Sequence, residues 1–219
     1  VTTHNNMIAS RLNLKNVLWI TENRVQSLSK VDEKVAEFFV KADDNAFLQL
    51  LLSKKGFLVE GATEFLLLPH FYKQLTGHSI EEDGISIISC NGISYKKYLA
   101  IADATGKRIA VITDNDKEQK KIDEATEFNK VNTLQHIFMG STVDDWTWEI
   151  SIYNINKNTL DGMITVQAGA KYLFHEKDYG AVVGKMLNNK VDTAYQMLTS
   201  GKIFSVPQYI KDAVGWINE

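Results

Sequence analysis

Cysteine, proline and long hydrophobic segments are scarce in this 219-residue sequence. The single cysteine, Cys90, excludes a disulfide scaffold and any zinc or iron–sulfur site that needs several thiolates. Only two prolines are present, so the chain is not a proline-rich linker protein. No run of about 18 apolar residues exists, and residues 1–10 lack the charged and apolar regions of a signal peptide. We therefore expect a cytoplasmic protein that does not cross a membrane.

The chain also has no large excess of one charge, because it contains 24 lysines and arginines and 27 aspartates and glutamates, which gives a net charge of −3. A broad basic surface that holds nucleic acid by itself is not expected, so any such binding would have to recruit cations. Hydrophobic residues make up 44% of the chain and charged residues 23%, as in ordinary globular proteins. The composition predicts a folded chain whose function depends on local motifs.

Residues 1–30 lack an initiator methionine and resemble the last strand–helix–strand of an ABC-type ATPase domain. In such ATPases an apolar strand ends in Thr-His, and the resemblance implies that His4 senses the nucleotide γ-phosphate. A departure is Asn5-Asn6, where Ser-Pro is common, and the alternative is a histidine that only caps the next helix. The P-loop signature G-x-x-x-x-G-K-S/T is absent, so we expect ATP to act only through a missing upstream ATPase domain.

The rest of the chain alternates short apolar runs with helical patterns. Helical spacing at residues 31–54, interrupted at 43–45, predicts a helical linker. Beyond it we predict strands at 56–60, 85–89, 108–113 and 133–139, with helices at 63–75, 95–104 and 118–130. This order predicts an α/β fold with a mostly parallel sheet flanked by helices. Pro69 is expected to kink or end the first of these helices.

Acidic residues follow two of the predicted strands. Glu60 ends the first strand, Gly61 allows a sharp turn, and Glu64 falls in the first turn of the next helix. Asp114 and Asp116 follow the third strand. Because ligands bind outside the carboxyl ends of parallel strands, we expect these side chains to share one crevice. Such carboxylates repel one another unless cations neutralise them, and an oxygen-rich site favours Mg²⁺ or Mn²⁺ over zinc.

The runs Glu60-Gly61-Ala62-Thr63-Glu64 and Asp114-Asn115-Asp116 resemble the acidic motifs of the Toprim domain, found in primases, topoisomerases, RNA maturases and certain nucleases. The run from Val59 to Pro69 is similar to the overcoming-lysogenisation-defect (OLD) family of ATP-dependent endonucleases, whose Gabija-type relatives act in antiphage defence. That family joins an ABC-type ATPase to a C-terminal Toprim domain. The resemblance implies a Toprim (Rossmann-like) core at 55–150 and a helical extension at 151–219.

The resemblance also implies a two-metal site for Mg²⁺ or Mn²⁺. Its metal ligands would be Glu60, Glu64, Asp114, Asp116 and Glu149, and its catalytic residues Glu60, Asp114, Asp116 and Lys202. Glu149 is chosen because Trp146-Thr147-Trp148-Glu149 resembles the family's T-L-E element, and Asp144 and Asp145 stay as alternatives. Lys202 is matched to a lysine that reaches the metal site in the family, with Lys171 and Lys185 as weaker candidates.

These motifs predict a metal-dependent DNA endonuclease, the nuclease part of an ATPase-linked antiphage or DNA-processing protein. Its partners would be DNA and the ATPase domain in cis, and pairing of the family's ATPases makes a homodimer one option beside a monomer. The lysine pairs at 54–55, 96–97 and 120–121 are candidate phosphate contacts, with a solvated surface as the alternative. Other hypotheses are a topoisomerase, primase or RNA maturase reaction, a phosphoacceptor domain using Asp114, and a non-catalytic assembly module.

Overall fold

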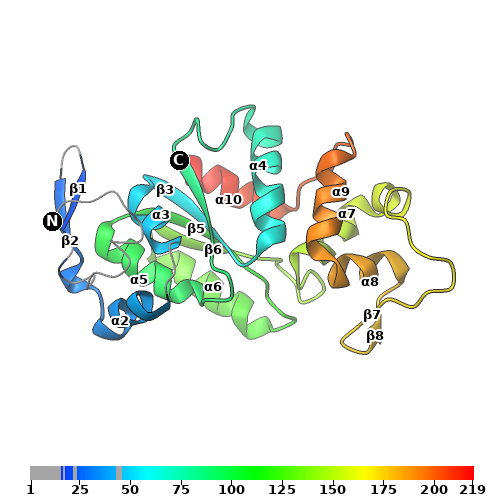
Figure 1. Cartoon of the computed structure of the whole chain (residues 1–219), viewed down its shortest axis with the longest axis horizontal. Helices are drawn as coiled ribbons and strands as arrows, with labels where there is room; N and C mark the ends of the chain where they lie inside the picture. The colour runs from blue at the N-terminus through cyan, green and yellow to red at the C-terminus, as the bar shows by residue number, and fades with distance from the viewer. Residues whose placement is uncertain (1–15, 17, 22–23, 43–45) are drawn as a thin grey trace.

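A computed structural model describes residues 16, 18–21, 24–42 and 46–219 of the protein (Figure 1). Within this part of the chain, four parallel strands form the central sheet in the order β4-β3-β5-β6. The strands are β3 (Lys55–Val59), β4 (Ile85–Ser89), β5 (Arg108–Ile112) and β6 (Gln135–Phe138). Since β4 and β5 flank β3, the strand order reverses between β3 and β5, which is where open α/β sheets bind ligands.

Helices cover both faces of the sheet because its strands are apolar on both sides. In β3, Phe57 and Val59 pack into the core under α4 (Ala62–Thr76) and α10 (Gln208–Asn218). Leu58 points to the opposite core. That second core contains residues of α2 (Glu33–Ala42), α3 (Ala46–Leu52), α5 (Tyr95–Thr105) and α6 (Gln119–Val131). The α/β class and the order of the predicted strands and helices are confirmed.

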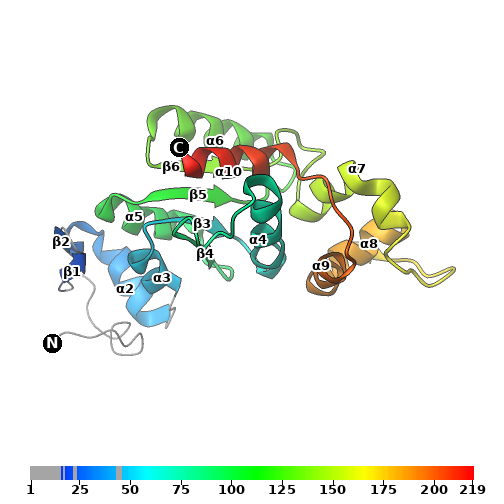
Figure 2. The same cartoon turned by 90° about the horizontal axis from the view of Figure 1, so that it is seen from above.

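The extension after the sheet begins with α7 (Trp148–Asp161) and a short hairpin of β7 (Leu173–Phe174) and β8 (Lys177–Asp178). Next follow α8 (Ala181–Asn188) and α9 (Lys190–Thr199), and α9 packs against α4. Helices α7, α8 and α9 gather at one end of the sheet, while α10 returns to lie over it (Figures 1 and 2). In the described residues, no helix is both long and apolar enough to cross a membrane.

A small antiparallel hairpin of β1 (Leu18–Thr21) and β2 (Arg24–Ser27) precedes the linker helices, followed by the 3-10 helix η2 (Leu28–Lys30). It lies at the end of the sheet opposite α7, α8 and α9 (Figure 1). The second strand of the strand–helix–strand pattern expected within residues 1–30 corresponds to β1, but its partner β2 was not predicted. His4 lies outside the described residues.

Helix α4 runs through Pro69 to Thr76, so the expected early end of this helix is wrong. Proline removes one backbone N–H donor, but the buried side of α4 keeps it packed on the sheet. Its buried residues on both sides of the proline include Leu67, Leu68, Phe71 and Tyr72. Packing of this apolar face thus outweighs the local cost of the proline.

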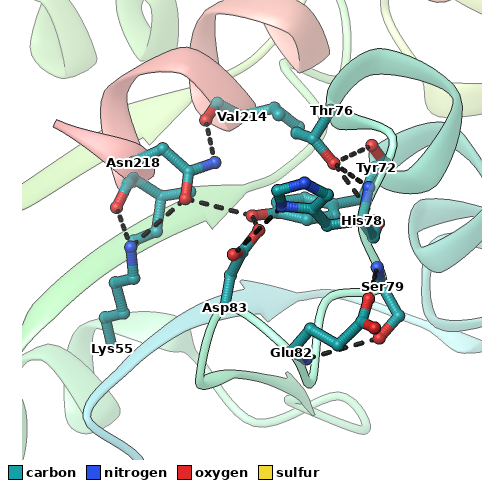
Figure 3. A network of polar contacts seen from close by, with 10 residues as sticks. Lys55, Tyr72, Thr76, His78, Ser79, Glu82, Asp83, Val214 and Asn218 are labelled. Carbon is teal, nitrogen blue, oxygen red and sulfur yellow. Dashed lines mark hydrogen bonds and ion pairs between the residues drawn. The ribbon is translucent and has the colours of Figure 1, made fainter.

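The last helix, α10, is held by cations at the amino ends of two strands. Lys55 Nζ donates to the Ile217 carbonyl at 3.0 Å, and Arg108 Nε donates to the Trp216 carbonyl at 3.1 Å. Positive charge at a helix C-terminus satisfies unpaired carbonyls and favours the helix dipole. On the α4 side, the Tyr72 hydroxyl lies 3.0 Å from Asn218 Oδ1 (Figure 3).

The outer edge of β6 is occupied by a side chain of α6. Asn129 Nδ2 donates to the Ile137 carbonyl at 2.8 Å, and its Oδ1 accepts from the Ile137 N–H at 2.8 Å. Among the described strands, β6 pairs with β5 on its other side. The side-chain amide therefore satisfies both backbone groups of this edge residue, as a neighbouring strand would.

Candidate metal and catalytic site

The two acidic motifs meet because their strands are neighbours in the sheet. Val59 of β3 is in register with Ile112 of β5, so Glu60 and Thr113 follow side by side at the carboxyl ends. The Thr113 hydroxyl donates a hydrogen bond to Glu60 Oε1. The parallel register thus brings the first and third predicted strand ends to one place, as the crevice hypothesis requires.

Asp114 connects this sheet end to helix α7. Its Oδ1 accepts a hydrogen bond of 3.0 Å from the backbone N–H of Trp148, the first residue of α7. The helix start is fixed by Thr147, whose side chain accepts from the Ile150 N–H at 3.3 Å. Glu149 follows in the first turn and is only 2% exposed. The local cap therefore places Glu149 beside the strand end that carries Asp114.

Glu64 reaches the same region from the start of α4. It is 6% exposed and lies three residues after Gly61, the N-cap of the helix. Gly61 has φ −142°, an extended conformation that any residue adopts, so the left-handed freedom of glycine is not what the turn needs. A Cβ at this position would lie 3.3 Å from Glu64 Oε2. The glycine therefore leaves room for the glutamate carboxylate at the helix start.

The pKa values of Glu64 and Asp114 are raised in part by neighbouring carboxylates, which places these side chains in one cluster. Burial raises the pKa of Glu64 to about 7, against the lowering effect of its own backbone N–H; Glu149 and Glu60 also raise it, and Lys190 lowers it. Burial also raises the pKa of Asp114 well above its usual value, and Glu60, Glu149 and Glu64 add to that rise. Four of the five predicted metal ligands are thus electrostatically coupled.

Lys190, at the start of α9, supplies positive charge to this cluster. Its Nζ lies 3.0 Å from Glu149 Oε2. Burial by itself lowers the pKa of Lys190, but Glu149, Asp114 and Glu64 raise it above the ordinary value. The lysine is therefore charged and faces the carboxylates. Sequence reasoning missed it, although the Asn188-Asn189 pair before it is a typical helix-breaking signal.

The other lysines considered from sequence lie elsewhere. Lys202 is exposed in the segment between α9 and α10, where its backbone N–H donates to Ser200 Oγ at 3.1 Å. Lys185 Nζ donates to the Thr165 carbonyl at 2.5 Å, and Lys171 is exposed. The structure thus brings Lys190, rather than Lys202, to the carboxylates, and the role of Lys202 stays a prediction from the resemblance.

Asp116 stands apart from the coupled carboxylates. It is exposed, has φ 52°, and forms an ion pair with Lys121 at the start of α6. Of the two alternatives to Glu149, Asp144 is exposed, and Asp145 Oδ1 accepts from Asn154 Nδ2 at 2.7 Å. Glu149 is the member of this group that shares the electrostatic environment of Asp114 and Glu64.

Asn115 joins the loop after β5 to the loop after β6. It is completely buried, and its Nδ2 lies within hydrogen-bond distance of the carbonyls of Gly140 (3.0 Å), Thr142 (2.8 Å) and Asp145 (3.2 Å). Its Oδ1 accepts from the Lys117 N–H at 2.9 Å. Asn115 therefore holds the loop that carries Asp114 and Asp116. Its position between the two aspartates in the sequence does not predict these hydrogen bonds.

Lys117 anchors the same loop from outside. It has φ 66°, its Nζ donates to the Tyr179 hydroxyl at 2.7 Å, and it lies 4.3 Å from the centre of the Trp146 ring. This cation–π contact links the D-x-D loop to Trp146 before α7 and to Tyr179 before α8. The segments that carry Asp114, Glu149 and Lys190 are therefore tied together on both sides of the cluster.

The comparison with protein families identifies the segment that carries these motifs. Residues 51–116 match the family model described as "Overcoming lysogenization defect protein-like, TOPRIM domain". This segment of the chain is similar to an OLD-like Toprim domain. The match includes Glu60, Glu64, Asp114 and Asp116 and ends before Glu149 and Lys190. No curated protein and no solved structure matches the chain.

The OLD-like Toprim domain belongs to a nuclease-type family, and Toprim domains generally use divalent metals such as Mg²⁺. The residues of the cluster fit such ions chemically, because they offer hard oxygen donors and no thiolate. Buried Glu149 Oε1 also lacks a hydrogen-bond partner. In the side-chain positions described, however, no three Asp, Glu, His or Cys residues are close enough to hold a metal ion.

Several of the predicted ligands are instead directed toward protein partners. Glu60 accepts from Thr113, Asp116 pairs with Lys121, and Glu149 pairs with Lys190. Loading the OLD-like Toprim domain with metal therefore requires these side chains to exchange such partners for the ion.

Proposed function

We propose that this chain is a nuclease that cleaves phosphodiester bonds of DNA with Mg²⁺ or Mn²⁺, as part of an ATPase-linked protein of antiphage defence or DNA processing. The observation that carries the proposal is the cluster of Glu60, Glu64, Asp114 and Glu149, of which Glu64 and Glu149 are buried, at the point where the strand order reverses. A cluster that only supported folding would not need four neighbouring carboxylates, two of them with raised pKa values, so a cationic ligand is the physical reason to keep them.

Divalent ions bound there would activate a water molecule and neutralise charge on the scissile phosphate. On the sheet side, the ions would be held by Glu60 and Asp114, which lie at adjacent strand ends. On the helix side, they would be held by Glu64 and Glu149, at the starts of α4 and α7. Because the pKa values of Glu64 and Asp114 are raised, these two carboxyl groups would have to lose their protons before a cation binds.

Lys190 would act on the negative charge that develops during cleavage. Its Nζ is already within the field of Glu149, Asp114 and Glu64, so the charge requires little rearrangement to face a phosphate. Fixed positive groups aimed at developing charge contribute a few kcal/mol to catalysis, on the order of 100-fold to 1,000-fold in rate. Lys190 would thus take the role that the resemblance implies for Lys202.

A plasmid assay tests the proposal. Supercoiled DNA is incubated with wild-type protein in Mg²⁺, in Mn²⁺ and in EDTA, and with Glu60→Gln, Asp114→Asn and Asp103→Asn. Asp103 is an exposed residue of α5 and serves as a matched control. We expect nicking that requires metal, falls at least about 100-fold in the two site variants and persists in the control.

Failure of the folded wild-type protein to cut DNA in either metal would contradict the proposal. Relaxation without nicks would instead indicate a topoisomerase-type reaction, and cleavage of labelled RNA but not DNA would indicate an RNA-processing enzyme. Retained cleavage by Glu60→Gln would remove the carboxylate cluster from the mechanism.

A further inference from the structure

A cleft of about 370 Å³ opens beside the carboxylate cluster, between α5, α6 and the carboxyl ends of β5 and β6. Glu60, Thr113 and Asp114 form its inner end. Its remaining lining residues are Tyr95, Lys96, Lys121, Glu124, Ala125, Phe128, Ile137 and Met139. The cleft therefore extends from the proposed catalytic carboxylates to a surface of lysine, aromatic and aliphatic side chains.

Two lysines of that surface differ from the other candidate phosphate contacts. Lys96 and Lys121 line the cleft. Lys55 is used to hold α10, as described above, and Lys97 rests 3.0 Å from the centre of the Phe38 ring. Lys120 pairs with Glu124 at 3.6 Å. Lys96 and Lys121, one lysine from each of two pairs, therefore lie in the same cleft, where Lys121 also pairs with Asp116 and Glu118.

The opposite wall of the cleft is apolar and aromatic. Phe128, Ile137 and Met139 contribute side chains that are buried or partly buried in the core. Tyr95 is partly buried, in contrast to Tyr98, which is completely buried. Burial raises the pKa of Tyr95, Glu60 and Glu124 raise it further, and Lys121 opposes them. Tyr95 therefore lines the same cleft as Glu60, Lys121 and Glu124, and its pKa responds to all three.

We infer that this cleft binds one unpaired nucleotide of the DNA strand, next to the phosphodiester that is cut. Its base would pack on Phe128 and Tyr95, and its phosphate would contact Lys96 and Lys121. An apolar, aromatic wall suits the face of a base, and two ammonium groups suit a phosphate. A base inside a duplex is stacked on both faces, so it enters such a cleft only when the strand is single, frayed or flipped. This inference rests on the proposed nuclease function.

The proposed contact between the substrate phosphate and Lys121 also affects Asp116. The Lys121 ammonium pairs with the Asp116 carboxylate, which keeps this predicted ligand away from the coupled cluster. The bound phosphate would therefore compete with Asp116 and Glu118 for the Lys121 ammonium.

Fluorescence anisotropy with a labelled single strand and with the matching duplex tests the inference. Binding is measured in EDTA and in Ca²⁺ for wild type, Lys96→Ala, Lys121→Ala, Tyr95→Leu and Lys130→Ala. Lys130 is an exposed lysine of α6 that pairs with Glu127, so its loss removes the same charge from the same helix. We expect about 10-fold weaker single-strand binding in the three cleft variants, no change in Lys130→Ala, and at most a small change for the duplex.

Two results would overturn the inference: equal losses for single strand and duplex, or cleft variants that bind like Lys130→Ala. Thermal melting of each variant shows that it is folded. The plasmid assay separates the two proposals. If the wild-type protein nicks DNA and the cleft variants bind single-stranded DNA as well as wild type does, the nucleotide site is refuted and the nuclease function is retained. Single-strand binding that depends on the cleft, in a protein that cuts nothing, would retain the site and remove the nuclease.

Discussion

The Lys190 ammonium lies 3.0 Å from Glu149 Oε2 and joins the start of α9 to the start of α7. Glu149 is almost completely buried, whereas the Lys190 side chain is partly exposed, so the pair orients a positive charge at the boundary of the cluster. Removal of the lysine would leave a buried carboxylate without its cation, which costs far more than the loss of a surface ion pair.

We predict that Lys190→Met destabilises the metal-free protein by about 1–3 kcal/mol and reduces DNA cleavage on the order of 100-fold. Urea unfolding and initial rates of plasmid nicking measure the two effects. Lys202→Met, at the exposed site named by the resemblance, is the competing variant. Loss of cleavage in Lys202→Met with normal rates in Lys190→Met would return the catalytic role to Lys202.

Stability of the metal-free protein should fall as pH rises. Glu64 has its pKa raised from 4.5 to about 7, so the folded state holds its proton more tightly than the unfolded state. Its contribution is complete below pH 4.5 and is lost as pH rises through about 7, by on the order of 3 kcal/mol. Urea unfolding in EDTA from pH 5 to pH 8 measures this loss, and Glu64→Gln should reduce the slope.

The control for this prediction is Glu82→Gln, because Glu82 is exposed and its pKa is lowered by hydrogen bonds from Ser79. This substitution should leave the stability change between pH 5 and pH 8 as in wild type. An unchanged slope in Glu64→Gln would show that the proton is not held at Glu64. Added Mg²⁺ should raise the melting temperature more at pH 8 than at pH 5, where protons compete with the ion.

Gly140→Ala should disrupt the loop after β6. A Cβ at this glycine would lie 2.1 Å from the Asp145 carbonyl oxygen, and the Gly140 carbonyl itself accepts from Asn115. We expect destabilisation of about 2 kcal/mol or more. Gly215→Ala in α10 is the matched control, because no atom lies within 4 Å of its added methyl group. Equal melting temperatures for the two variants would contradict this account of the loop.

Tyr72→Phe should weaken the attachment of α10. The Tyr72 hydroxyl is 2.5 Å from Asp83 Oδ2 and 3.0 Å from Asn218 Oδ1, and burial with the Asp83 bond raises its pKa to about 12 (Figure 3). Loss of the hydroxyl is predicted to cost about 1–2 kcal/mol in chemical unfolding. Exposed Tyr195→Phe should change stability by less than about 0.5 kcal/mol. Similar losses in both variants would speak against a specific role of Tyr72.

The sheet and its covering helices were predictable because each strand is a short apolar run and each helix has regular apolar spacing. The meeting of Glu60 with Asp114 was predictable for the same reason, since parallel strands align their carboxyl ends. Lys190 was not, because its approach to Glu149 depends on how α8 and α9 pack after a helix break at Asn189. Sequence spacing carries no direct signal for such a long-range contact.

Short elements and single-atom contacts were also beyond sequence reasoning. The β7–β8 hairpin has two residues in each strand, too few to show an alternating pattern. The helical extension at 151–219 was expected without a break at Asn189, which in the structure lies between α8 and α9. The fully buried position of Asn115 depends on a loop that only the folded chain creates.

The amide of Asn129 has a consequence for contacts between chains. At Ile137 it occupies the N–H and C=O that an added strand would use, so a second chain can pair there only by breaking both bonds. An uncovered strand edge invites aggregation and the growth of one continuous sheet through several molecules. One side chain of α6 thus blocks the addition of a further strand at this edge of the sheet. Two copies of the protein would have to associate through surfaces other than the middle of β6.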